Sequence, residues 1–141
     1  MSVLDLFDLH GKKALVTGAS SGIGKQVALA YAQAGAELAL AARNSDALEA
    51  LAEEIAASGG KAIPIACDVT RPDQVTAMVD RMTAEMGGID IAVCNAGVVS
   101  VTPMLDMSLE EFERIQNTNV TGVFLTAQAA ARAMVVAGLG G

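Results

Sequence analysis

Three glycines with the spacing G-x-x-x-G-x-G, at Gly18, Gly22 and Gly24, follow closely on the apolar run Ala14-Leu15-Val16. The apolar run predicts a buried strand, and the alanine-rich segment after Gly24 predicts a helix. Glycines in such a turn let the chain bend tightly and let backbone N–H groups approach a phosphate closely. The helix that begins near Gly22 points its positive end at the same place. This segment therefore predicts a binding site for the pyrophosphate of a dinucleotide.

The residues that we expect to contact this ligand include side chains as well as glycines. The predicted set is Thr17, Gly18, Ser20, Ser21, Gly22, Ile23 and Gly24, in which the three hydroxyl groups add hydrogen-bond donors. The alternative interpretation is an ordinary strand-to-helix turn that binds nothing.

Apolar runs alternate with amphipathic segments along the rest of the chain. The predicted strands are 13–17, 38–42, 62–67 and 89–94, and the predicted helices are 22–34, 46–58, 71–86 and a long helical stretch over 108–136. Strands and helices that alternate at this spacing form right-handed crossovers and a parallel sheet. A doubly wound sheet has the order 3-2-1-4, which places Pro64 on an edge strand, where its missing N–H is tolerated. We therefore predict an α/β fold with a Rossmann-type, doubly wound parallel sheet, truncated after its fourth strand.

Local signals predict how the later helices begin. Thr70 is expected to cap the third helix, and Ser108 and Glu111 match the S-x-x-E capping box of the fourth. Poor helix formers inside the last helical stretch predict a kink or a functional polar position there. These residues are Asn117, Asn119 and Gly122. The tail 138–141 is expected to be a loop that leads toward a further strand.

Composition and charge exclude several classes of function. The 141 residues suffice for one domain or part of one, and a net charge of −7 argues against a nucleic-acid partner. No apolar segment reaches the ~18 residues that a membrane span needs, and residues 1–10 do not resemble a signal peptide. Cys67 and Cys94 are not paired in a C-x-x-C motif and are expected to be free thiols in a reducing cytoplasm. No residues have the spacing of metal ligands.

The end of the second strand indicates which nucleotide is preferred. An NAD site usually has an acidic residue ~20 positions after the glycines, which binds the ribose 2′-hydroxyl. At this distance the chain has Ala42, Arg43 and Asn44 and no carboxylate. The guanidinium of Arg43 can pair with a 2′-phosphate and stack on adenine, so NADP(H) is favoured over NAD(H). The alternative is that Arg43 is a solvated residue at a helix start.

Two further segments follow predicted strands. Asp68 and Val69 come after the third strand, and Asn95-Ala96-Gly97 comes after the fourth, beside the glycine turn. The small residues Ala96 and Gly97 would let a ribose of the nucleotide lie against the backbone. The alternative for Asp68 is a carboxylate that caps the helix near Thr70, and the alternative for Asn95-Ala96-Gly97 is a plain tight turn.

Together, four motifs resemble the short-chain dehydrogenase/reductase family over essentially the whole chain. They are Thr17-Gly18-x-x-x-Gly22-x-Gly24, Asp68-Val69, Asn95-Ala96-Gly97 and Asn119-Val120-x-Gly122. The leading segment Val3-Leu4-Asp5-Leu6-Phe7 is similar to the sugar and polyol reductase branch. The family often has a second asparagine where Cys94 stands, and this departure is expected to cost little.

The resemblance implies hydride transfer between a nicotinamide and a small carbonyl or secondary alcohol substrate, in a homo-oligomer. It implies that the Asp68 carboxylate binds the adenine amino group and that Asn119 is a catalytic residue. In the family, a buried asparagine at this place frees a backbone carbonyl that holds a water of the proton relay. The family's catalytic serine, tyrosine and lysine would lie beyond residue 141, so we expect residues 1–141 to be the NADP(H)-binding domain and to be inactive alone.

Two other hypotheses stay open. One is a non-catalytic dinucleotide-binding fragment or pseudoenzyme. The other is a protein similar to sugar-nucleotide epimerases, which is disfavoured because the spacing G-x-x-G-x-x-G is missing from the glycine turn.

Overall fold

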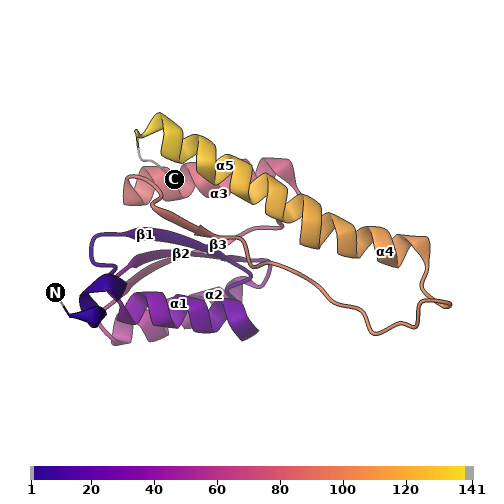
Figure 1. The fold of residues 1–141 in the computed structure, drawn as a ribbon, viewed down its shortest axis with the longest axis horizontal. Coiled ribbons are helices and arrows are strands. Elements are labelled where there is room, and N and C mark those ends of the chain that lie inside the picture. The colour runs from indigo at the N-terminus through magenta and orange to yellow at the C-terminus, as the bar shows by residue number, and fades with distance from the viewer. Residues whose placement is uncertain (1, 139–141) are drawn as a thin grey trace.

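A computed structural model describes residues 2–138 and shows a four-stranded parallel sheet between two layers of helices (Figure 1). The strands are β1 (Lys13–Thr17), β2 (Glu37–Ala42), β3 (Lys61–Ala66) and β4 (Ile91–Val93). The helices are η1 (Val3–Phe7), α1 (Gly22–Gln33), α2 (Ser45–Ala57), α3 (Pro72–Met86), α4 (Leu109–Gln116), η2 (Asn117–Thr121) and α5 (Gly122–Val136). The predicted strand order is confirmed, because the sheet runs β3-β2-β1-β4.

The edge position predicted for Pro64 is also confirmed. Among the described residues, β3 pairs only with β2, and Pro64 lies opposite Leu40. The carbonyl of Pro64 accepts a hydrogen bond from Nη1 of Arg81 on α3, at 3.0 Å. Because a proline has no N–H to donate, the outer edge of β3 suits it better than a central strand.

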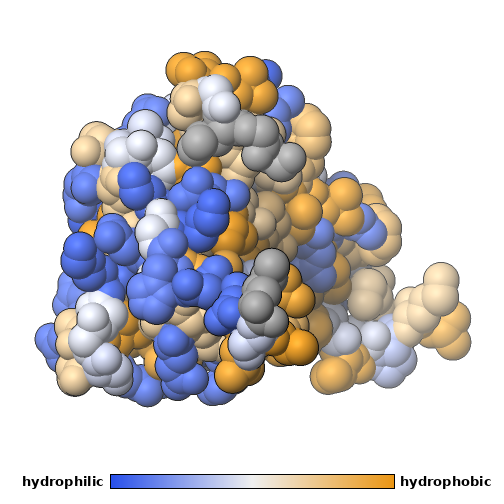
Figure 2. Space-filling view, turned by 60° about the vertical axis from the view of Figure 1, so that its left-hand side comes forward, coloured by the Kyte–Doolittle hydropathy of each residue, from blue (hydrophilic) through white to orange (hydrophobic). Residues whose placement is uncertain are grey.

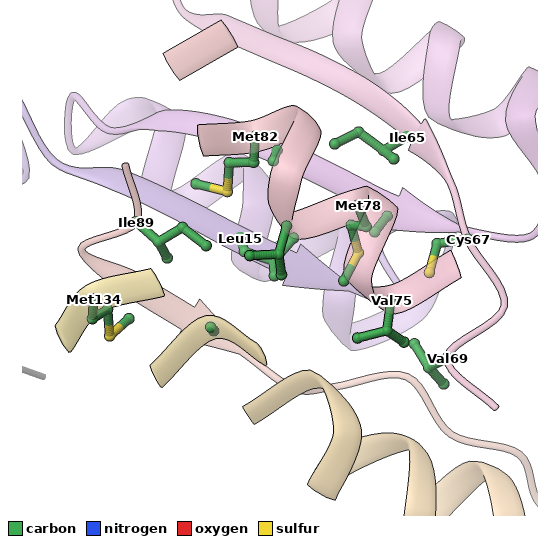
Figure 3. Close-up of a cluster of buried hydrophobic side chains, with 13 residues drawn as sticks. Leu15, Ile65, Cys67, Val69, Val75, Met78, Met82, Ile89 and Met134 are labelled. Carbon is green, nitrogen blue, oxygen red and sulfur yellow. The ribbon is translucent and has the colours of Figure 1, made fainter. Parts of the chain in front are cut away.

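Both faces of the sheet are buried, which explains why the first strand is a continuous apolar run. Successive side chains of a strand point to opposite faces. Ala14 and Val16 therefore pack under α1 and α2, whereas Leu15 packs under α3 and α5, and all three are fully buried. Figure 3 shows the core on the side of α3 and α5, in which Leu15 and Ile65 of the sheet meet side chains of these two helices.

Three local predictions need correction. The fourth strand is Ile91–Val93, shorter than the predicted 89–94. The N-cap of α3 is Arg71, which makes no side-chain cap hydrogen bond. Thr70 does not cap this helix, and its hydroxyl donates to Asp68 instead. The capping box at α4 is only half formed, since Ser108 Oγ accepts from the Glu111 amide at 3.1 Å but the Glu111 carboxylate has other partners.

The irregularity predicted inside the last helical stretch is confirmed. Residues Asn117–Thr121 form one π-helical turn, η2, between α4 and α5. Such turns are often found at functional sites. Of the loop predicted at 138–141, Gly138 lies in a turn after α5, and residues 139–141 lie outside the described residues.

The surface is uneven in polarity. On the face in Figure 2, hydrophilic residues cover much of the left and centre, while hydrophobic residues gather at the top and on the part that projects to the right. The segment between β4 and α4 exposes large apolar side chains, among them Val101 and Leu105. Within residues 2–138, no helix is both long enough and apolar enough to cross a membrane.

Candidate cofactor-binding site

A cavity of about 770 Å³ opens at the carboxyl ends of the four strands. Its volume is in the range of small-molecule and cofactor sites, and ligands of open α/β sheets bind at this edge. Its walls come from the segments that follow each strand and from α4 with η2. The lining residues are Gly18, Ser20, Ser21, Ile23, Ala42, Arg43, Asn44, Cys67, Asp68, Val69, Thr70, Asn95, Ala96, Gly97, Val98, Glu110, Glu113, Arg114, Asn117 and Thr118.

Most of the residues predicted from the sequence are thus brought together around one cavity. Four of them, Thr17, Gly22, Gly24 and Asn119, are not part of its lining. Each of the four nevertheless contacts or shapes a segment that is.

The three glycines have different roles. Gly18 and Gly22 have φ of +67° and +56°, a conformation that favours glycine. A Cβ at Gly22 would meet no heavy atom within 4 Å, so the backbone there is uncovered. At Gly24 a Cβ would lie 2.2 Å from the Gly18 carbonyl oxygen, so this glycine lets α1 pack against the turn. This cradle of exposed backbone at a helix N-terminus fits a pyrophosphate.

Thr17 does not present its hydroxyl to a ligand, so that part of the prediction is wrong. Its side chain is buried, and Oγ1 donates to the Val93 carbonyl at 3.3 Å. The same oxygen accepts from the amides of Asn95 at 3.0 Å and Ala96 at 3.1 Å. One donor and two acceptor positions are all that a hydroxyl has. Thr17 therefore ties the end of β4 to the end of β1.

Asn95 adds to this tie from the other side. Its Nδ2 donates to the carbonyl of Thr17 at 3.2 Å. The segment Asn95-Ala96-Gly97 is therefore held against the end of β1 and the start of the glycine turn by hydrogen bonds from both segments.

At the end of β2, the side chains of the two polar residues Arg43 and Asn44 differ in their contacts. Asn44 Oδ1 accepts from the Ala47 amide at 3.1 Å and caps α2. Arg43 lines the cavity, is exposed, and has no ion pair within 4.0 Å among residues 2–138. Its positive charge is close enough to Asp68 to affect the pKa of that carboxyl.

Asp68 is held by two neighbours that stabilise its ionised form. Oδ1 accepts from the Thr70 amide at 2.9 Å and from the Thr70 hydroxyl at 2.7 Å. Burial alone would raise the pKa of Asp68, but these two hydrogen bonds and the charges of Arg43 and Arg71 hold it below its usual value. The Asp68 amide donates to Gln74 Oε1 at 2.8 Å, a contact that the sequence analysis missed.

Asn119 is exposed rather than buried, which corrects the sequence-based expectation. Its Oδ1 accepts from the Val98 amide at 2.7 Å, and its Nδ2 donates to the Val98 carbonyl at 2.8 Å. The side chain therefore pairs with one backbone residue through both of its polar atoms. This contact links η2 to the cavity wall, because Val98 lines the cavity.

The sequence analysis also missed the wall that α4 and η2 contribute. It consists of Glu110, Glu113, Arg114, Asn117 and Thr118. Their spacing of three, four, seven and eight residues is that of one helix face, and this was the signal available in the sequence. The wall adds two carboxylates to a cavity whose other charged groups are Arg43, Asp68 and Arg114.

Cys67 is the one thiol at the cavity among the described residues, and it is almost fully buried. Burial, with the charges of Asp68 and Asp73, raises the pKa of the Cys67 thiol to about 11. Residues 2–138 contain no group of three or more His, Cys, Asp or Glu side chains that could hold a metal ion.

The doubly wound sheet with a glycine-rich cradle at its carboxyl edge defines a Rossmann-like α/β protein. Comparison with known proteins narrows the class. The family model described as short chain dehydrogenase matches residues 12–141. The chain therefore belongs to the short-chain dehydrogenase family.

Individual relatives agree with this assignment. The chain is 42% identical over 134 residues to D-threitol dehydrogenase of Mycolicibacterium smegmatis, covering 95% of this chain and 52% of that protein. It is 76% identical to a short-chain type dehydrogenase/reductase from Mycobacterium marinum, with a TM-score of 0.96, covering 100% of this chain and 57% of that one.

A third relative, a 7α-hydroxysteroid dehydrogenase solved with NADH and 7-oxo glycochenodeoxycholic acid, is 36% identical with a TM-score of 0.91. The match covers 98% of this chain and 54% of that one. The chain thus spans about half the length of these relatives.

Proposed function

We propose that residues 1–141 are the dinucleotide-binding domain of an oxidoreductase that interconverts a small carbonyl compound and a secondary alcohol. The observation that carries this proposal is the 770 Å³ cavity, which joins the glycine cradle to Asp68 and to the segment Asn95-Ala96-Gly97. A bound nicotinamide dinucleotide supplies the hydride chemistry. The residues of this chain bind and orient it: the backbone at Gly18 and Gly22 faces the pyrophosphate, and Asp68 faces the adenine.

The preferred cofactor in this proposal is NADP(H). Arg43 lines the cavity at the end of β2 without an ion pair among residues 2–138, so its guanidinium is available to a 2′-phosphate. No acidic residue stands at positions 42–44 to bind a ribose 2′-hydroxyl. Asn44 is proposed to contribute through its backbone, because its side chain caps α2.

The substitution Arg43→Ala tests this preference. A charge-assisted contact contributes about 1.5–3 kcal/mol, so we expect roughly a 10- to 150-fold weaker affinity for NADPH. The affinity for NADH should change little. Calorimetric titration of the folded variant with both cofactors measures the difference.

Arg71→Ala is the matched control. Arg71 also affects the Asp68 carboxyl, but it pairs with Asp73 at 3.4 Å and does not line the cavity. Its removal should weaken the two cofactors slightly and equally. Equal losses for NADPH and NADH in Arg43→Ala would show that Arg43 does not choose between them.

Asn119 is proposed to be the catalytic-type residue of this chain. Its amide is fixed on Val98 and it lies in a π-helical turn, where the shifted hydrogen-bond pattern can leave a backbone carbonyl free for a water. The proposal also includes assembly into a homo-oligomer and a cytoplasmic location. The exposed apolar side chains of Phe112 and Phe124, and the free state of Cys67 and Cys94, are consistent with these two points.

A further inference from the structure

Glu111 has a side-chain interaction that its sequence motif does not account for. In a capping box, the glutamate at this place would bind back to the backbone of Ser108. Instead, Glu111 Oε1 accepts a hydrogen bond from Thr102 Oγ1 at 2.9 Å and another from Ser100 Oγ. The carboxylate thus joins the start of α4 to the segment that enters it.

That segment, Val98–Thr102, is held at both ends by side chains. Glu111 holds Ser100 and Thr102 at one end. Asn119 holds the backbone of Val98 at the other, with contacts of 2.7 and 2.8 Å. Within the segment, the Thr102 amide donates to Ser100 Oγ at 3.1 Å.

Apolar burial contributes little to holding this segment in place. Its alternate residues point to solvent: Val99 is 86% exposed and Val101 is 97% exposed. Ser100 and Thr102 are the partly buried residues between them, and their hydroxyls meet Glu111. The position of the segment therefore depends on hydrogen bonds, and a shared carboxylate acceptor is the strongest kind available to two hydroxyls.

The position of the segment also shapes the cavity. Gly97 and Val98 line the cavity, and a Cβ at Gly97 would lie 3.3 Å from Asn119 Oδ1. A shift of Val98 would therefore move both the cavity wall and the amide of Asn119. In the sheet order β3-β2-β1-β4, this wall lies across the glycine turn from Arg43 and Asp68. It faces the end of the cavity opposite to the adenosine end.

We propose that Glu111 is a positioning residue, which fixes Val98–Thr102 and thereby the cavity wall that meets the nicotinamide half of the dinucleotide. The assignment of that half rests on the proposed function. The anchoring of Val98–Thr102 by Glu111 does not, because it follows from the contacts alone.

The experiment compares Glu111→Leu with Glu111→Gln in the whole chain. Leucine removes the acceptor, whereas glutamine keeps an Oε1 that can accept from both hydroxyls. Glu53→Leu is the control, because Glu53 is an exposed glutamate of α2 whose side chain makes no hydrogen bond or ion pair among residues 2–138. The two ligand probes are NADPH and adenosine 2′,5′-bisphosphate, which lacks the nicotinamide half. Amide hydrogen exchange at Val98 and Thr102 is measured in parallel.

In Glu111→Leu we expect roughly tenfold weaker NADPH binding, about the effect of one charge-assisted hydrogen bond, with unchanged binding of the bisphosphate. Exchange at the Val98 and Thr102 amides should become roughly tenfold faster, while exchange in β1 and β2 stays as it was. Glu111→Gln should keep most of the NADPH affinity and most of the slow exchange at Val98 and Thr102. Glu53→Leu should change neither property.

Three results would overturn the proposal. They are unchanged exchange at Val98 in Glu111→Leu, equal weakening of both probes, and a failure of glutamine to restore binding. If the unsubstituted chain bound neither probe, the proposed function would fail. The exchange measurement would still decide whether Glu111 holds the segment.

Discussion

Two segments that meet at the centre of the cavity are stabilised in opposite ways. The glycine turn, 17–24, is built from backbone in close contact, where the absence of side chains at Gly18 and Gly24 lets α1 and the Asn95 side chain approach. The segment 95–102 is built from side-chain hydrogen bonds, which Thr17, Asn119 and Glu111 supply from three other elements. The first segment should therefore be sensitive to added atoms, and the second to removed polar groups.

The substitution Gly24→Ala tests the first half of this comparison and should have the largest effect. A Cβ there would lie 2.2 Å from the Gly18 carbonyl oxygen and 2.5 Å from Asn95 Nδ2, and backbone cannot give way cheaply. Overpacking of this kind costs about 3 kcal/mol in the free energy of unfolding. Chemical denaturation of the variant measures this loss.

Gly59→Ala separates overpacking from backbone strain. Gly59 has φ of +86°, but a Cβ there would meet nothing within 4 Å. Only the strain remains, which is about 1 kcal/mol for a left-handed residue. If Gly24→Ala destabilised the protein no more than Gly59→Ala, the close approach of α1 to the turn would not matter to stability.

The substitution Thr17→Val tests the second half. Valine has the shape of threonine but leaves the Ala96 amide without the hydroxyl that it donates to. The Asn95 amide and the Val93 carbonyl also lose their bonds to this hydroxyl and keep the hydrogen bond that joins them to each other, at 3.0 Å. The loss of these three hydrogen bonds, with one partly buried amide left unpaired, should cost about 2 kcal/mol in the free energy of unfolding.

Thr17→Ser keeps the hydroxyl and removes only a methyl group, at a cost of about 1 kcal/mol. The serine variant should also keep slow amide exchange at Ala96, which the valine variant loses. Equal destabilisation by valine and serine would mean that the hydroxyl does not hold the two strand ends together.

The comparison also explains what could be predicted from the sequence. The strand order, the edge position of Pro64 and the irregular turn at Asn117–Thr121 were predictable, because each depends on a local pattern or on the backbone properties of one residue type. The glycine turn was predictable for the same reason.

The side-chain contacts were harder to predict. The Thr17 hydroxyl bonds to residues 76 to 79 positions away, and Asn119 bonds to a residue 21 positions away. Glu111 matched a local motif but bonds to a different segment. A hydroxyl or carboxylate has several possible partners within reach, and only the tertiary structure decides among them.

The smallest expected effect concerns Asp68, a cavity residue whose pKa depends on a side-chain hydrogen bond from Thr70. Because its pKa in the folded protein lies below the usual value of 3.8, its contribution to stability is fully present above pH 3.8. That contribution is lost only as the pH falls through the lowered pKa. The carboxylate is therefore ionised throughout the neutral and weakly acidic range, as the contact proposed above with an adenine amino group requires.

Thr70→Val should raise the pKa of Asp68 toward its usual value, because it removes the hydroxyl donor at 2.7 Å and leaves the burial that opposes ionisation. The shift should be partial, since the Thr70 amide still donates at 2.9 Å and Arg43 and Arg71 keep their charges. A carbon-13 NMR titration of the Asp68 carboxyl measures it.

Thr76→Val is the control for this titration, because the Thr76 hydroxyl donates to the Pro72 carbonyl at 3.0 Å and not to Asp68. That variant should titrate like the unsubstituted chain. An Asp68 pKa that did not rise in Thr70→Val would assign the lowered pKa to the backbone and the two arginines. Asp68 would then resemble the glycine turn, because backbone groups would determine its environment. Stabilisation by side-chain hydrogen bonds would in that case be limited, within this cavity, to residues 95–102.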